Sequence, residues 1–168
     1  GFRFYSRREV KDAISFLQVL YNPADTVSWG RIINVPPRGV GKVTLSRVRE
    51  SGWDPDVIEK ETKLAWKKWI KQAESGATLE LLDLMLNKTG YLDWLDDGSD
   101  EGRERIDNLK ELRSVADLFP DLGEFLENVS LIESANRPDA FELDAVTLMT
   151  IHASKGLEFP VVFLVGME

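Results

Sequence analysis

Cysteine is absent from this 168-residue chain, and histidine occurs only once, as His152. The lack of cysteine excludes disulfide frameworks, zinc ribbons and cysteine nucleophiles. Any serine–histidine triad or histidine-rich metal site would have only His152 to use. No apolar run approaches the roughly 18 residues of a membrane-spanning helix, and no signal segment opens the chain. We therefore expect no membrane partner, no metal site and a cytoplasmic location.

Positive charge is also scarce. The chain has 29 acidic residues against 21 Lys and Arg, which gives a formal net charge of -8. A negative surface argues against a broad electrostatic grip on nucleic acid, although it leaves room for a small, local contact. Hydrophobic residues make up 43% of the chain, enough for a core. The length predicts one domain, or one compact domain plus a fragment of another.

Apolar residues recur at helical spacing over most of the chain. Ser6, with Glu9 three residues later, predicts a capping box at the start of the first helix. The apolar stripe of that helix consists of Val10, Ile14, Leu17 and Tyr21. Gly90 is expected to end a later helix in the left-handed conformation, and Asp121 with Glu124 opens the last one. Further helices are predicted at residues 26–33, 46–50, 55–74, 78–86, 106–119 and 121–132.

Three short segments at the two ends of the chain have β character. Residues 146–151 are rich in β-branched side chains, and residues 160–165 form a continuous apolar run typical of a strand buried on both faces. Residues 2–5 resemble a further short strand. Because two short strands cannot make a stable sheet alone, we expect the chain to be cut from a longer protein that supplies the other strands.

Gly39-Val40-Gly41 follows two prolines and precedes a predicted helix, an arrangement that resembles the hairpin of a helix-hairpin-helix motif. Glycines let the backbone approach a phosphate closely, and a helix N-terminus presents free amides. Such a contact would not read base sequence. The alternative is a tight turn that needs a positive φ at a glycine; a β-branched side chain at Gly41 would block both. The candidate duplex-binding residues are Arg38, Gly39, Val40, Gly41, Lys42 and Thr44.

Four lysines recur at helical spacing in the predicted helix over residues 55–74, and would line one face of it. They are Lys60, Lys63, Lys67 and Lys71. Trp66 and Trp69 would lie largely on the other face. A solvated face of an amphipathic helix is the simpler interpretation, and a second duplex-facing stripe is the alternative.

An acidic stretch superficially fits the spacing of a calcium-binding loop. Its polar residues are Asp93, Asp97, Gly98, Ser99, Glu101 and Glu104. The third ligand position would be Leu95, which has no ligand oxygen. We therefore expect a solvated acidic turn that runs into a helix.

Residues 146–164 read VTLMTIHASKGLEFPVVFL. By chemistry alone this is a strand–turn–strand connection, and His152 has no visible partner for a role as general base. The string nevertheless resembles motif V of the UvrD/PcrA/Rep-type superfamily 1 DNA helicases, a long and specific signature. Residues 3–12, 31–41 and 105–112 resemble the same helicases, so the likeness covers nearly the whole chain. It is weakest over residues 51–75.

The resemblance implies a mainly α fold: a helical 2B-like insertion subdomain with a small β appendage from a RecA-like α/β motor subdomain, 2A. Residues 1–8 would be the edge of 2A, residues 9–144 the insertion, and residues 145–168 the motif V segment of 2A. It further implies that Thr150 and His152 lie near single-stranded DNA and that Gly156 and Glu158 lie near the nucleotide.

For the intact protein the resemblance implies ATP-driven 3′-to-5′ translocation with Mg²⁺, with duplex and single-stranded DNA at a junction as partners and repair proteins as further ones. The chain itself has no G-x-x-x-x-G-K-[ST] loop to hold nucleotide phosphates. We expect no ATPase activity, no catalytic residue and no cofactor in the chain alone. Two alternatives stay open: a protein-interaction or autoinhibitory module, and the same insertion in a recombination-type helicase–nuclease.

Overall fold

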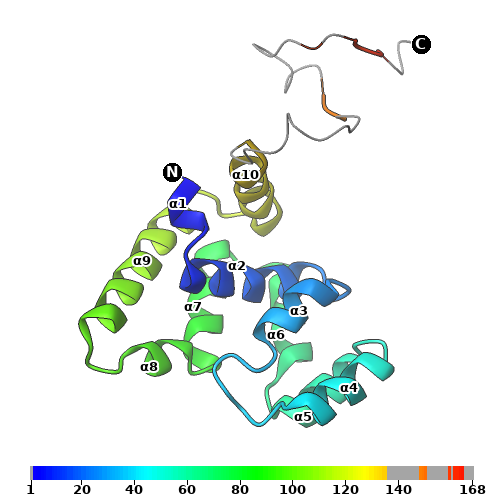
Figure 1. Cartoon of the computed structure of the whole chain (residues 1–168), viewed down its shortest axis with the longest axis vertical. Helices are drawn as coiled ribbons and strands as arrows, with labels where there is room; N and C mark the ends of the chain where they lie inside the picture. The colour runs from blue at the N-terminus through cyan, green and yellow to red at the C-terminus, as the bar shows by residue number, and fades with distance from the viewer. Residues whose placement is uncertain (1, 136–147, 151–158, 160, 165–168) are drawn as a thin grey trace. The chain divides into compact units, whose positions relative to one another are not determined.

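The computed structural model describes residues 2–135, 148–150, 159 and 161–164. The chain divides into two compact units, residues 1–136 and residues 137–168. Ten helices are described, all of them in the first unit (Figure 1). They are α1 (Phe2–Tyr5), α2 (Arg8–Tyr21), α3 (Thr26–Ile32), α4 (Lys42–Glu50), α5 (Pro55–Thr62), α6 (Trp66–Ala73), α7 (Thr78–Lys88), α8 (Tyr91–Leu95), α9 (Asp100–Asp117) and α10 (Leu122–Ala135). The expected mainly α class is confirmed.

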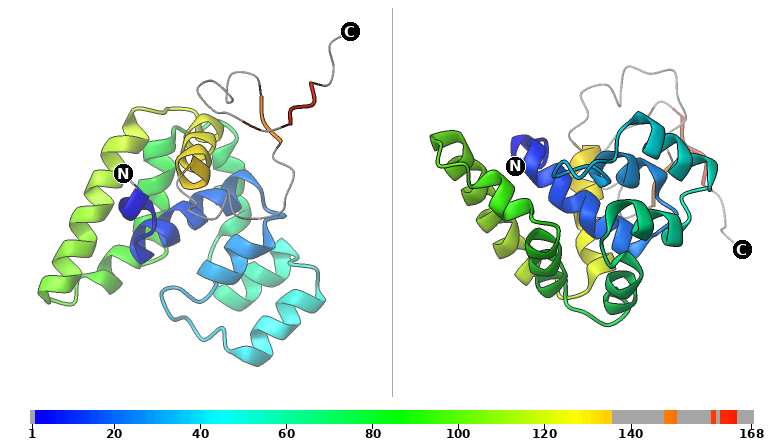
Figure 2. Two further views of the ribbon diagram at one scale, coloured as in Figure 1. Left: turned by 45° about the horizontal axis from the view of Figure 1, so that its top comes forward. Right: turned by 90° about the horizontal axis from the view of Figure 1, so that it is seen from below.

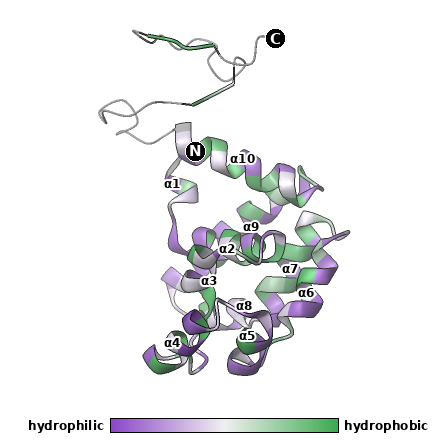
Figure 3. Cartoon of the chain, turned by 90° about the vertical axis from the view of Figure 1, so that its right-hand side faces the viewer, coloured by the Kyte–Doolittle hydropathy of each residue, from purple (hydrophilic) through white to green (hydrophobic). Residues whose placement is uncertain are grey.

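Helix α2 is the centre of the first unit. It packs against α3, α6, α7, α9 and α10, and its apolar residues from Val10 to Leu20 are almost fully buried. Figure 3 shows hydrophobic and hydrophilic residues alternating along the helices, as expected of amphipathic helices around a shared core. Tyr21 departs from the predicted stripe, because its side chain is 61% exposed.

An aromatic cluster joins α2, α3, α6 and α8. The ring of Trp66 lies 4.8 Å from that of Trp29 and 5.2 Å from that of Trp69, edge to face in both cases. Phe16 packs against Trp66 and Tyr91. Aromatic side chains bury large apolar areas, so this cluster contributes a substantial part of the core energy.

The helix predicted over residues 55–74 is two helices, α5 and α6. Lys63 takes a left-handed conformation, with φ of 58°, and ends α5. The Oε2 atom of Glu59 then accepts a hydrogen bond at 2.6 Å from the backbone amide of Lys67, in the first turn of α6. The single-helix prediction is wrong because this break uses neither Gly nor Pro, the residues that mark breaks in a sequence.

The predicted capping box at the first long helix is also wrong. Helix α2 is capped at Arg7 without a side-chain hydrogen bond. The hydroxyl of Ser6 instead donates to the carbonyl of Arg3 at 2.9 Å. Glu9 is buried and accepts a hydrogen bond from the side chain of Asn108, so tertiary contact has replaced the local cap.

The segment Phe2–Tyr5, expected as a short strand, is the helix α1. It packs against α2 and α10, where Phe4 and Tyr5 bury their rings. In the second unit, residues 148–150 and 161–164 have no regular strand structure. The remaining residues of the two expected strands lie outside the described residues, and the β appendage is not confirmed. Within the described part of the chain, no helix is long and apolar enough to cross a bilayer.

Candidate nucleic-acid interface

The side chain of Asn34 organises the loop between α3 and α4. Its Oδ1 atom accepts hydrogen bonds from the backbone amides of Arg38, at 2.8 Å, and Val40, at 3.1 Å. Val40 is buried and fixes the loop to the core. The sequence analysis missed this role of Asn34. Its only signal was an Asn directly after a predicted helix, a residue type that commonly bonds to nearby backbone amides in turns.

The two glycines of the hairpin differ in backbone conformation. Gly39 has a φ of +82°, which a residue with a side chain adopts only with strain. Gly41 has a φ of -80° and a ψ of -173°, an extended conformation open to any residue. The expectation of a positive φ at Gly41 is therefore wrong; the turn requires it at Gly39. A Cβ atom added at Gly41 would meet nothing within 4 Å, so neither backbone nor space demands a glycine there.

The first turn of α4 contains backbone amides that donate no hydrogen bond to another described residue. Gly41 is the N-cap and has no side chain to offer, and the first amide bonded back along the helix is that of Leu45, which donates to the Gly41 carbonyl at 2.9 Å. The amides of Lys42, Val43 and Thr44 accordingly have no acceptor among the described residues. Together with the partial positive charge of a helix start, they form a place where an anion is stabilised.

Arg38 is tied to its own loop. Its Nη2 atom donates to the carbonyl of Val35 at 2.8 Å, and its Nε atom is buried without a hydrogen-bond partner among the described residues. Burial lowers the pKa of its guanidinium from the ordinary value, although arginine keeps its charge in proteins. Arg38 therefore braces its own loop and adds a positive charge to it.

Further cations lie along α4, which pairs with α5 at the edge of the first unit (Figures 1 and 2). Lys42 is exposed, and Thr44 is half-buried. The Nη1 atom of Arg47 lies 2.7 Å from Oε1 of Glu61 on α5, which fastens the two helices. Arg49 is exposed and has no ion pair in the described residues. Along α4 the hairpin is thus followed by three basic side chains, Lys42, Arg47 and Arg49, and one acidic side chain, Glu50.

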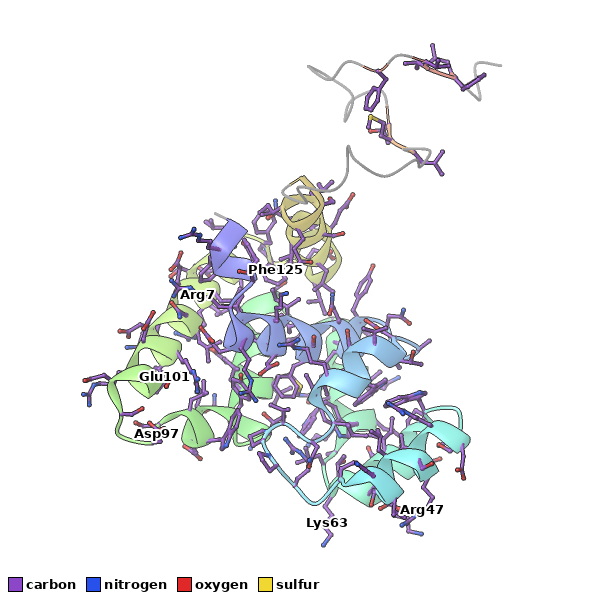
Figure 4. The ribbon with its side chains drawn as sticks, viewed as in Figure 1. Arg7, Arg47, Lys63, Asp97, Glu101 and Phe125 are labelled. Carbon is purple, nitrogen blue, oxygen red and sulfur yellow. The ribbon has the colours of Figure 1, made fainter. Side chains whose placement is uncertain are left out.

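The predicted lysine stripe does not exist as one face. The break between α5 and α6 places Lys60 on one helix and Lys67 and Lys71 on another. Lys63 occupies the left-handed junction and extends away from the helices in Figure 4, which also shows Arg47 on α4. Lys67 is bonded to Asp56, and that hydrogen bond raises the pKa of its ammonium group.

A buried polar network links Asp12 and Arg31, which lie in two of the segments that carry the helicase resemblance, with Tyr91. Asp12 is almost fully buried. Its Oδ1 atom accepts a hydrogen bond from Arg31 Nε at 2.7 Å, and its Oδ2 atom accepts one from the Tyr91 hydroxyl at 2.8 Å. Burial and the charge of Asp12 both raise the pKa of Tyr91. The network therefore fixes α3, and with it the start of the hairpin loop, to α2 and α8.

A second set of hydrogen bonds joins α9 to the start of α2 through Asn108. Its side-chain amide donates to Oε1 of Glu9 at 2.7 Å, and its Oδ1 atom accepts a hydrogen bond from Arg7. Figure 4 shows Arg7 facing α9. Arg7, Glu9 and Asn108, which lie in segments that carry the helicase resemblance, thus hold α2 and α9 together. This structural role was not predicted from the sequence.

The acidic stretch forms a hydrogen-bonded turn. The Oδ1 atom of Asp97 accepts hydrogen bonds from the hydroxyl and the amide of Ser99, and they hold the pKa of Asp97 below its usual value. The hydroxyl of Ser99 in turn accepts from the amide of Gly102 at 2.9 Å and caps α9. Arg105 pairs with Glu101. In the part of the chain that the structure describes, no cluster of three or more His, Cys, Asp or Glu side chains could hold a metal ion.

Of the four motif V residues, only Thr150 is described; its side chain is exposed. His152, Gly156 and Glu158 lie outside the described residues, so their predicted contacts with single-stranded DNA and nucleotide stay predictions. Thr150 belongs to the second unit, whereas the hairpin belongs to the first.

The helical fold and the signature at residues 146–164 define a domain of a known helicase family. The chain matches the family described as "UvrD-like helicase C-terminal domain" over residues 1–75 and 57–168, and it belongs to that family. Over its whole length it is 35% identical to the ATP-dependent DNA helicase PcrA of Staphylococcus epidermidis. It is 34% identical, again over its whole length, to the proteins of that name from Bacillus subtilis and Staphylococcus aureus. The chain spans 27% of the length of each of these relatives.

Proposed function

We propose that this chain is the helical 2B-like insertion, with adjoining segments of the motor subdomain, of an ATP-dependent 3′-to-5′ DNA helicase, and that its Gly39-Val40-Gly41 hairpin contacts the backbone of duplex DNA. The observation that carries the hairpin contact is the start of α4. There, the amides of Lys42, Val43 and Thr44 have no acceptor among the described residues. A side chain at Gly41 would occupy the open space beside them.

Phosphate is the anion that this geometry suits. Backbone amides and a helix N-terminus favour a compact negative group, and Lys42 is exposed beside them. None of these groups reads a base edge, so the contact is independent of DNA sequence. Because one hairpin reaches only two or three phosphates, we expect a duplex affinity near the non-specific range of about 10⁻⁴–10⁻⁶ M at physiological salt.

Replacing Gly41 by valine tests the contact without disturbing the turn, because the extended backbone and the open space both accept a side chain. Ser46→Val is a matched control, since it adds a similar side chain at an exposed position of the same helix. Fluorescence anisotropy with a labelled duplex should show binding weakened about tenfold or more for Gly41→Val, the size of effect that loss of one charge-assisted hydrogen bond produces. Ser46→Val should bind as the parent does. If both folded variants bind like the parent, the hairpin is only a turn.

For the intact protein, we propose that Thr150 and His152 lie near single-stranded DNA and that Gly156 and Glu158 lie near the nucleotide, with ATP and Mg²⁺ as cofactors. The membership in the UvrD-like family supports this assignment. A carboxylate such as Glu158 can hydrogen-bond ribose hydroxyls. Glu158→Ala in the intact helicase should therefore weaken nucleotide affinity a few-fold to tens-fold, since a hydrogen bond to a charged group contributes roughly 1.5–3 kcal/mol. Unchanged affinity and turnover would remove Glu158 from the site.

The net charge of -8 favours a second candidate function, in which the insertion chiefly binds a repair protein or inhibits the motor. An acidic surface repels duplex DNA everywhere except near the hairpin. The recombination-type helicase–nuclease is a variant of the main proposal, in which the same insertion serves a larger assembly. A salt titration of duplex binding separates the DNA-binding function from the protein-binding one, because only the former depends on neutralised phosphates.

A further inference from the structure

A cleft of about 730 Å³ opens where α2 and α6 end and where α7 and α10 begin. This volume falls within the roughly 300–1,000 Å³ of typical binding clefts. Its apolar part includes Tyr21, Ile70 and Leu122, together with Pro23 and Pro120. The side chain of Tyr21, predicted to lie in the core, is 61% exposed here and presents an aromatic ring to whatever enters.

The cleft carries negative charge only. Its lining includes the carboxylates of Glu74 and Asp121, and no Lys or Arg is among the described residues that line it. Two helices end at the cleft and two begin there, so their partial end charges largely offset one another. One oxygen of Asp121 accepts the amide of Glu124 at 2.9 Å, and Glu74 lies 3.7 Å from exposed Lys71, an ion pair of small energy. The charged side chains that line the cleft are therefore both carboxylates, and Lys71 beside Glu74 offsets only part of their negative charge.

We propose that this cleft docks a segment of a separate partner protein, and that the segment carries a Lys or Arg beside a large apolar side chain. The apolar walls suit the apolar side chain, and the two carboxylates suit the cation. The same charges disfavour nucleic acid, whose phosphates they repel. This surface is therefore a binding site of opposite character to the hairpin at the start of α4.

A segment that continues directly from α10 is a poorer occupant than a separate protein. The cleft is lined by Leu122 and Gly123 at the first turn of α10, and the chain leaves the described helices at Ala135, the other end of that helix. Fourteen residues of α-helix rise about 20 Å. A segment that continued directly from α10 would have to double back along the whole helix to reach the cleft.

The test uses the 168-residue chain, labelled with ¹⁵N, and three short synthetic peptides of equal length. The first alternates Lys or Arg with Leu and Phe, the second replaces each basic residue by Glu, and the third replaces each apolar residue by Ser. The backbone amides of Gly76 and Gly123, which line the cleft, serve as reporters. The basic apolar peptide should shift both amides in a saturable manner, and the other two should shift them weakly or not at all. A short duplex should leave both unmoved.

Charge reversal then locates the contact. Glu74→Lys should lower the affinity for the basic apolar peptide about three- to tenfold, the range expected for one charge at the rim of a binding site. Glu80→Lys is the matched control, because Glu80 is exposed and lies outside the cleft lining, and it should leave binding unchanged. The proposal is overturned if no peptide shifts Gly76 and Gly123, if the acidic peptide shifts them equally, if duplex DNA does so, or if the two variants behave alike. None of these results depends on whether the hairpin binds DNA.

Discussion

Arg31 Nε donates a hydrogen bond to Asp12 Oδ1 at 2.7 Å, and the carboxylate that receives it is almost fully buried. Arg31 lies in the last turn of α3, three residues before Asn34, which shapes the hairpin loop. Asp12 lies in the second turn of α2, the central helix. This ion pair therefore connects the core of the helical unit to the loop that we propose contacts DNA.

Removing the charge of Asp12 should destabilise the protein markedly. Asp12→Asn weakens the hydrogen bonds from Arg31 and Tyr91 together, and each hydrogen bond to a charged group contributes roughly 1.5–3 kcal/mol. Because the Arg31 side chain is 36% exposed, solvent screening reduces the contribution of its ion pair to the free energy of unfolding. We expect a loss of about 2–3 kcal/mol in the free energy of unfolding, measured by urea denaturation.

Asp83→Asn provides the matched control for that experiment. Asp83 receives two hydrogen bonds from Arg113, at 2.6 and 2.8 Å, but this pair lies on the surface. Its loss should cost less than about 1 kcal/mol. Equal losses for the two variants would contradict the structural importance assigned to the buried pair.

The stability of the protein should fall in alkaline solution because of Tyr91. Burial and Asp12 raise the pKa of its hydroxyl above the ordinary value of 10.0. A raised folded-state pKa contributes stability that is fully present below the unfolded-state pKa and is lost as the pH rises through the folded-state value. Urea midpoints should therefore decline above pH 10, and less steeply in Tyr91→Phe. Tyr5, whose pKa burial also raises, should supply part of the decline that remains.

The two hairpin glycines should respond to alanine to different extents. Gly39→Ala forces a side chain into the left-handed region and should destabilise the protein by roughly 1–2 kcal/mol. Gly41→Ala meets no atom and no strain, but Gly41 is the N-cap of α4, where alanine is less favourable than glycine, so this cost opposes the gain through the unfolded state and the net change should stay within roughly 0.5 kcal/mol. Thermal unfolding of the two variants gives the comparison. A Gly41→Ala variant destabilised as much as Gly39→Ala would mean that the hairpin geometry is not as described.

Asn34 should control the order of the hairpin loop. In Asn34→Ala the amides of Arg38 and Val40 lose their acceptor, and their hydrogen-exchange protection should fall. Asn34→Asp keeps an acceptor oxygen and should restore protection, while its added negative charge should weaken duplex binding. Protection that is unchanged in Asn34→Ala would show that the loop is held by other contacts.

The isolated chain should not hydrolyse ATP, because its sequence contains no loop to hold the nucleotide phosphates. Turnover measured with added single-stranded DNA should equal that of buffer. DNA-stimulated turnover that persists through repurification, and that is lost in a variant of the chain, would contradict the assignment of the chain as a part of a larger motor.

Much of the helical unit was predictable where the signal is local. Gly90 ends a helical stretch with a φ of 74°, and Asp121 caps α10 by accepting the amide of Glu124, both as predicted. The predictions failed where distant contacts decide. The break at Lys63 depends on Glu59 capping the next helix, and the failed cap at Ser6 depends on Glu9 turning to Asn108. Local pattern carries no information on such tertiary contacts.

The candidate site was located by sequence but not understood from it. The segment Gly39-Val40-Gly41 was identified, and it does lie at the start of a helix. Which glycine needs a positive φ, and that Asn34 holds the loop, could not be predicted because both depend on the path that the loop takes between α3 and α4. The cleft beside Tyr21 was missed for the same reason: four helix ends separated in sequence meet there.

The salt dependence of duplex binding tests the central claim most directly. The parent chain should show a shallow slope of log K against log salt, equivalent to two or three neutralised phosphates, whatever the DNA sequence. Lys42→Ala should flatten that slope by about one unit. Lys88→Ala, which removes an exposed lysine from the end of α7, should leave it unchanged. Equal slopes for the parent and Lys42→Ala, with both proteins folded by circular dichroism, would contradict the assignment of the hairpin as the duplex contact.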